Sequence, residues 1–114
     1  MRKYGNKKIK YDGLTFDSKK EASRYKELKI LEQLGEIKDL QLQKPFTLIP
    51  SQYQIINGKK KSLERPVKYK ADFVYFDNEK KEVVVEDTKG YKTKDYVIKR
   101  KLMLYIHGIQ IKEI

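Results

Sequence analysis

Apolar residues recur at helical spacing in two parts of the chain. The first helix is predicted over 18–34, because Ser18-Lys19-Lys20-Glu21 has the sequence of a capping box and Gly35 suits the C′ position. Between these signals the apolar positions are Ala22, Tyr25, Leu28, Leu31 and Leu34. The second helix is predicted over 93–106, with His107-Gly108 ending it.

Runs of β-branched and aromatic residues predict strands between and after the two helices. One strand is predicted over Val67–Phe76 and a second over Glu82–Thr88. The turn at Asp77-Asn78 between them predicts that the two strands pair antiparallel. Earlier, Leu40, Leu42, Phe46 and Leu48 suggest strands that Pro45 interrupts. Ile109 and Ile111 alternate with polar residues, which suits a final strand running parallel to one of the others.

Two turn sequences predict hairpins outside these strands. Asp12-Gly13 suits a short hairpin near the N-terminus, and residues 50–66 read as a loop or as a hairpin around Asn57-Gly58. Together the elements indicate one α/β domain over 1–114, built on a mixed sheet.

Charge and composition limit the classes of function that the chain can have. The net charge is +11, which raises affinity for nucleic acid or anionic lipid but is also common in small proteins without a nucleic-acid role. The chain has no cysteine and one histidine, so a thiol nucleophile and a cysteine-based zinc site are excluded, and a Ser-His-Asp triad is disfavoured. No apolar stretch approaches the roughly 20 residues that span a bilayer, and no signal peptide is recognised. We therefore expect no membrane partner and a cytoplasmic location.

The candidate catalytic residues are an acid in one predicted strand and an acid-x-lysine sequence at the end of the next. Asp87 and Lys89 share a strand face, and Asp72 lies in the partner strand. Without cysteine, any metal must be held by oxygen ligands, which favours Mg²⁺ or Mn²⁺. Asp72 and Asp87 are the candidate ligands, the Thr88 carbonyl could complete the shell, and Glu21 could reach the site from the first helix.

Asp72 followed by Asp87-x-Lys89 resembles the motif of the PD-(D/E)XK nuclease superfamily. The stretch 16–22 resembles the acid-bearing helix of many members, and the whole chain is similar to a group of small phage-encoded proteins assigned to that superfamily. The resemblance implies a restriction-endonuclease-like αβββαβ core and a magnesium-dependent endodeoxyribonuclease. Glu21, Asp72 and Asp87 would bind the metal, and Lys89 would assist the nucleophilic water. Selectivity for branches or junctions is a further expectation by analogy.

The DNA-binding surface is predicted in the basic segment after the motif. Its residues are Lys92, Lys94, Lys99, Arg100 and Lys101, and Tyr91 and Tyr96 could stack on unpaired bases. Cutting two phosphates would require a homodimer.

Several alternatives stay open at this point. Glu86 adjoins Asp87, so the identity of the second acid is not unique, and Ala71 stands where the motif often has proline. The capping box alone explains Glu21, and Asp72 could simply pair with a lysine. A non-catalytic nucleic-acid-binding protein on a nuclease-like fold, or an RNA-directed nuclease, is the rival interpretation.

Overall fold

A computed structural model describes residues 8–114, and the prediction that the chain is a single domain stays a prediction. The chain is organised in two compact units. The first comprises the residues up to Leu40 together with Val74–Val84, and the second comprises Gln41–Phe73 and Val85–Ile114. In chain order the elements are β1 (Ile9–Tyr11), β2 (Leu14–Phe16), α1 (Lys19–Gln33), β3 (Ile37–Ile49), β4 (Gln52–Ile56), β5 (Lys59–Glu64), β6 (Val67–Asp77), β7 (Glu82–Asp87), α2 (Lys94–His107) and β8 (Lys112–Glu113).

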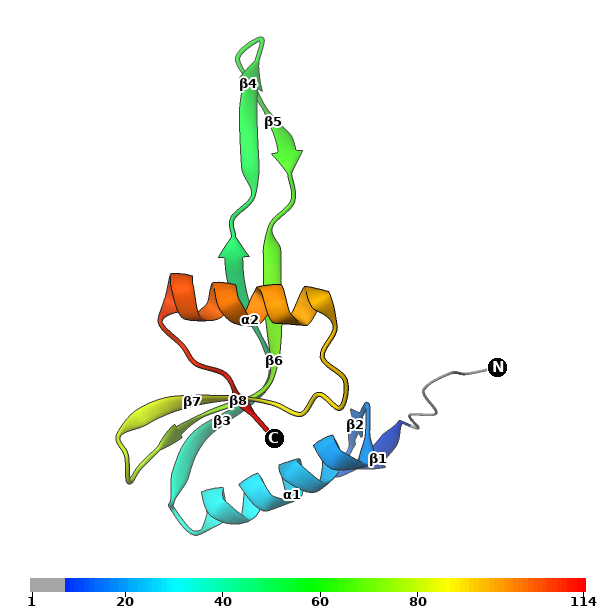
Figure 1. The fold of residues 1–114 in the computed structure, drawn as a ribbon, viewed down its shortest axis with the longest axis vertical. Helices are drawn as coiled ribbons and strands as arrows, with labels where there is room; N and C mark the ends of the chain where they lie inside the picture. The colour runs from blue at the N-terminus through cyan, green and yellow to red at the C-terminus, as the bar shows by residue number, and fades with distance from the viewer. Residues whose placement is uncertain (1–7) are drawn as a thin grey trace. The chain divides into compact units, whose positions relative to one another are not determined.

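The main sheet has four strands in the order β3-β6-β7-β8 (Figure 1). Residues 78–81 join β6 to β7, a connection too short for anything but an antiparallel pair. After the crossover helix α2, β8 pairs with β7 in parallel, with Glu86 opposite Lys112 and Asp87 opposite Glu113. The predicted mixed α/β fold is thus confirmed, although the last strand begins later than Ile109.

Local sequence signals account for both helices. Ser18 caps α1 by accepting a hydrogen bond from the Glu21 backbone N–H at 3.2 Å, as the capping box predicts. In the first unit the side chains of Phe16 and Tyr25 pack together with ring centroids 5.1 Å apart. Thr93 caps α2 in the same way, and Gly108, at φ 67°, ends that helix.

The prediction that Pro45 interrupts a strand is wrong, because β3 runs unbroken from Ile37 to Ile49. The reason is its place at the edge of the four-stranded sheet, where a missing backbone N–H need not cost a ladder hydrogen bond.

The segment 50–66 forms a hairpin, β4–β5, as one of the two interpretations predicted. Asn57 and Gly58 both have positive φ, at 51° and 74°, which suits a two-residue turn between antiparallel strands. Pro50 and Pro66 lie just outside its two strands, where β3 ends and β6 begins. Because proline cannot donate to a ladder, the hairpin forms a separate two-stranded sheet.

Helix α2 packs on β3 and β6 within the second unit. His107 Nε2 donates a hydrogen bond to the Thr47 carbonyl oxygen at 2.8 Å, and the rings of Tyr69 and Tyr96 lie 6.3 Å apart. The Lys89 ammonium lies 5.1 Å from the ring centroid of Tyr96, so the start of α2 is beside the end of β7, where the candidate acids lie. Among residues 8–114, no helix is both long enough and apolar enough to cross a membrane.

Candidate functional site

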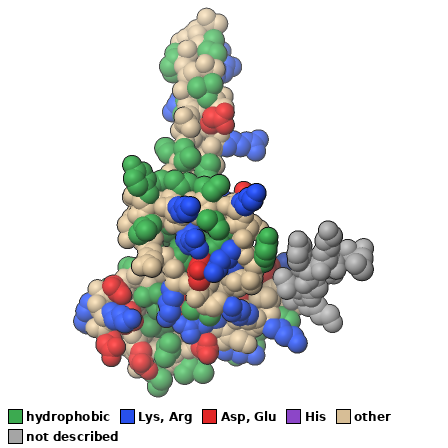
Figure 2. Space-filling view, viewed as in Figure 1, with side chains coloured by type: hydrophobic (Ala, Val, Ile, Leu, Met, Phe, Trp, Pro, Cys, Tyr) green, Lys and Arg blue, Asp and Glu red, His purple; other side chains and the backbone are tan. Residues whose placement is uncertain are grey.

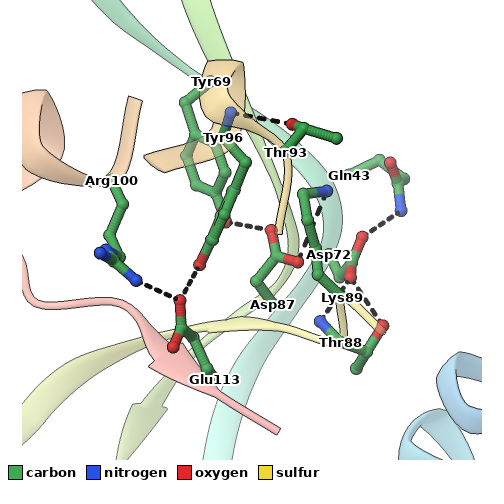
Figure 3. A network of polar contacts seen from close by, with 10 residues as sticks. All are labelled: Gln43, Tyr69, Asp72, Asp87, Thr88, Lys89, Thr93, Tyr96, Arg100 and Glu113. Atoms are coloured by element: carbon green, nitrogen blue, oxygen red, sulfur yellow. Dashed lines mark hydrogen bonds and ion pairs between the residues drawn. The ribbon is translucent and has the colours of Figure 1, made fainter. Parts of the chain in front are cut away.

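Asp72, Asp87, Thr88 and Lys89 lie together in the second unit, at the end of β7 (Figure 3). Asp72 accepts hydrogen bonds from the Thr88 backbone N–H and the Thr88 hydroxyl, both at 2.8 Å. Lys89 Nζ lies 3.6 Å from Asp87 Oδ1. The structure therefore brings together four of the residues that the sequence singled out.

Asp87 is fully buried and only partly satisfied. Its Oδ2 accepts a 2.5 Å hydrogen bond from the Tyr69 hydroxyl. Its Oδ1 has no hydrogen-bond partner among the described residues, since the 3.6 Å separation from Lys89 is an ion pair too long for a hydrogen bond. A buried carboxylate oxygen that accepts no hydrogen bond is costly, and the ion pair with Lys89 is the one favourable contact described for this oxygen.

The pKa of Asp87 is raised above its ordinary value. Burial is the main cause, and the nearby negative charge of Asp72 adds to it. The hydrogen bond from Tyr69 and the charge of Lys89 act in the opposite direction and lower the pKa. A cation bound beside Asp72 and Asp87 would offset the repulsion between their two negative charges.

The donor set at this point fits a hard divalent cation. Asp72 and Asp87 offer carboxylate oxygens, the ligands that magnesium and manganese prefer. Within residues 8–114, no group of three or more His, Cys, Asp or Glu side chains is placed to hold a metal ion. The fit therefore rests on these two carboxylates and on Asp87 Oδ1, which accepts no hydrogen bond from the described residues.

Glu86 and Glu21 are the other two acids that the sequence analysis named as candidate ligands. Glu86 is fully buried, but it is Asp87 that makes the ion pair with Lys89 and receives the bond from Tyr69. Glu21 is also buried, and its carboxylate accepts a 3.0 Å hydrogen bond from the Asp17 backbone N–H. Glu21 belongs to the first unit, so its role as a ligand stays a prediction.

Three residues of this network were missed in the sequence: Gln43, Tyr69 and Glu113. Gln43 donates to Asp72 Oδ1 at 3.3 Å, and Tyr69 holds Asp87. The signal available for Tyr69 was its place in the predicted strand 67–76, three residues before Asp72. For Gln43 and Glu113, nothing local in the sequence signals the contact.

Tyr96 corrects an expectation of the sequence. Only 3% of its surface is exposed, and its hydroxyl donates a 2.7 Å hydrogen bond to Glu113, so it cannot stack on bases. Tyr91, in contrast, is 75% exposed. The prediction that the 92–101 segment binds DNA stays a prediction; two of its members, Lys92 and Arg100, each lie 3.1 Å from Glu113.

Glu113 links β8 to α2 next to the site (Figure 3). The hydrogen bond from Tyr96, followed by those from Arg100 and Lys92, lowers the pKa of Glu113 to about 2. On the β7 side, the Ile114 N–H donates to the Asp87 carbonyl oxygen at 2.9 Å. The last strand thus fixes the backbone of Asp87 from one side.

Replacing Glu113 with Gln tests this link. We expect a loss of about 1 kcal/mol or less in the free energy of unfolding at pH 7, because partly exposed ion pairs are screened. Since the pKa of Glu113 is lowered in the folded protein, its stabilisation is present above its ordinary value of 4.5 and is lost as the pH falls towards 2. Urea unfolding of wild type and Glu113→Gln at pH 7 and pH 3 should show the difference narrowing at the lower pH, whereas a constant difference would contradict it.

The chain belongs to a family described as "Protein of unknown function (DUF1064)", whose model matches residues 1–112. No curated protein and no solved structure matches the chain significantly.

Proposed function

We propose that this protein is a magnesium-dependent endodeoxyribonuclease of the PD-(D/E)XK type, acting on DNA in the cytoplasm. The observation that carries the proposal is the buried Asp87 carboxylate, with one oxygen lacking a hydrogen bond, beside both Asp72 and Lys89. Once the separate β4–β5 hairpin is set aside, the order α1, β3, β6, β7, α2, β8 is consistent with the αβββαβ core that the resemblance implies. The net charge of +11 suits a polyanionic substrate.

Each residue has a defined role in this proposal. Asp72 and Asp87 would hold the cation, with the Thr88 carbonyl as a further ligand. When bound, a divalent cation lowers the pKa of a coordinated water and offsets negative charge on the phosphate. The Lys89 ammonium would orient the attacking water or stabilise the charge that develops on the phosphate oxygens. Gln43 and Thr88 would fix the Asp72 carboxylate through the hydrogen bonds already described.

The decisive experiment is a cleavage assay on four substrates: linear duplex, nicked duplex, single-stranded DNA and a four-way junction. Each would be incubated with Mg²⁺, Mn²⁺ or a chelator. We expect cleavage with either metal and none with the chelator, and faster cutting of the junction would support branch selectivity and a dimer. DNA binding without cleavage in every condition would leave the non-catalytic binding protein as the function.

Tyr69→Phe tests how the site sets the ionisation of Asp87. The hydroxyl bond lowers the pKa of Asp87, so its loss should raise that pKa further above the ordinary range. Only the ionised carboxylate binds a cation well, so activity should be lost at a higher pH on acidification. We expect the acidic limb of the pH–rate profile to move upward while the rate at high pH stays near wild type. A uniform drop at all pH values would assign Tyr69 a purely structural role.

A further inference from the structure

The β4–β5 hairpin, residues 52–64, protrudes from the rest of its unit and is called the arm below (Figure 1). Every residue from Gln52 to Glu64 is exposed. An isolated two-stranded hairpin is at best marginally stable in water, so one that carries large apolar side chains in the open suggests a surface made for a ligand.

Both faces of the arm carry basic and apolar side chains. The register pairs Ile55 with Lys60 and Ile56 with Lys59, so each face carries one isoleucine and at least one lysine near the turn. Ile55 is 69% exposed and Ile56 is 44% exposed. Figure 2 shows basic and hydrophobic side chains exposed along this part of the molecule.

The charge of the arm suits a polyanionic partner. Between residues 50 and 66 the chain has four basic side chains and one acidic side chain: Lys59, Lys60, Lys61 and Arg65 are basic, and Glu64 is acidic. A second copy of the arm would bring like charges together, so self-pairing is disfavoured. Because lysines project from both faces, the arm can contact phosphates on two sides at once.

We infer that the arm inserts tip-first into the major groove of a DNA duplex. The major groove is about 12 Å wide and admits a two-stranded β-ribbon. Lysines on opposite faces would meet the phosphates of the two groove walls, and Ile55 and Ile56, beside the Asn57-Gly58 turn, would contact base edges. The choice of DNA as the ligand rests on the proposed function, but the arm's role in binding does not require cleavage.

The test compares two arm variants with a matched control. Lys59→Gln with Lys61→Gln removes two charges from one face, and Ile55→Ser with Ile56→Ser removes the apolar tip. Lys20→Gln with Lys80→Gln removes the same charge from exposed positions elsewhere. Each protein is titrated with a 30-base-pair duplex and with a 30-nucleotide single strand over a range of salt concentrations, and its thermal melting is recorded.

We expect the lysine pair to lower the slope of log affinity against log salt on the duplex by roughly two, because each lost phosphate contact removes about 0.9. The isoleucine pair should weaken duplex binding severalfold at unchanged slope and leave single-strand binding nearly as in wild type. The control should keep the wild-type slope on the duplex.

Two outcomes overturn the inference. One is that both arm variants bind the duplex as wild type does. The other is that the isoleucine pair changes the oligomeric state in sedimentation velocity while duplex binding stays unchanged, which would make the arm a protein interface. Cleavage is measured separately. A wild type that cuts DNA but binds it independently of the arm refutes only this inference, and arm-dependent binding without cleavage refutes only the proposed nuclease.

Discussion

Replacing Asp87 with Asn is expected to lower the DNA cleavage rate roughly 100-fold or more, because loss of a charged metal ligand costs several kcal/mol of transition-state stabilisation. DNA binding should change little, since the exposed lysines that would contact phosphates remain. The measurements are initial rates with saturating Mg²⁺ and binding to the same duplex in a chelator.

The same variant should fold at least as stably as wild type near neutral pH. Asp87 has a pKa raised by burial, so the folded state binds its proton more tightly than the unfolded state does. The free energy of unfolding therefore falls as the pH rises from 3.8, the ordinary pKa of an aspartate, through the raised pKa of Asp87 in the folded protein. Asparagine cannot ionise, so the variant does not lose this stability. The Asn side-chain oxygen can still accept the bond from Tyr69.

A variant that is inactive but not destabilised would separate function from folding. Glu86→Gln is the matched comparison, because Glu86 is the adjacent acid and is equally buried. If Glu86→Gln is inactive and Asp87→Asn retains full activity, the wrong acid has been chosen. If Asp87→Asn melts far below wild type, its buried carboxylate is a structural group.

Much of the fold was predictable because its signals are local. The capping box before α1 and the Asn57-Gly58 turn specify their own backbone conformations, whatever the chain does elsewhere. The parallel pairing of β8 followed from the helical crossover that precedes it. The prediction at Pro45 was wrong because a proline disrupts a strand only where its missing N–H would have bonded to a neighbouring strand. Whether a strand lies at the edge of its sheet depends on the strand order, which is not a local property of the sequence.

The site was predictable where its residues are close in sequence. Asp87, Thr88 and Lys89 are consecutive, although β7 ends at Asp87, before the predicted end at Thr88. Asp72 lies on the neighbouring strand β6, so closeness in sequence and the antiparallel pairing were enough to associate the four residues. Gln43 and Glu113 come from β3 and β8, and only the tertiary fold brings them to this network. Tyr96 was misjudged for the same reason: its burial depends on β8, which follows it in the chain.

Lys89→Met and Lys89→Arg form the second decisive pair. Among the described residues, Lys89 is the cation that forms an ion pair with the buried Asp87, and its charge lowers the pKa of that carboxyl. Met keeps a similar length of side chain and removes the charge, so we expect a rate loss of roughly 100-fold and an acidic limb moved to higher pH.

Arginine separates two roles that lysine could play. An arginine keeps the positive charge but cannot be deprotonated at any pH used in an assay. If Lys89 acts only through its charge, Lys89→Arg should recover much of the rate lost in Lys89→Met and restore the acidic limb. If the lysine exchanges a proton with the attacking water, Lys89→Arg should restore the acidic limb but not the rate. Wild-type cleavage by Lys89→Met would remove Lys89 from the mechanism, and with it the acid-x-lysine basis of the proposal.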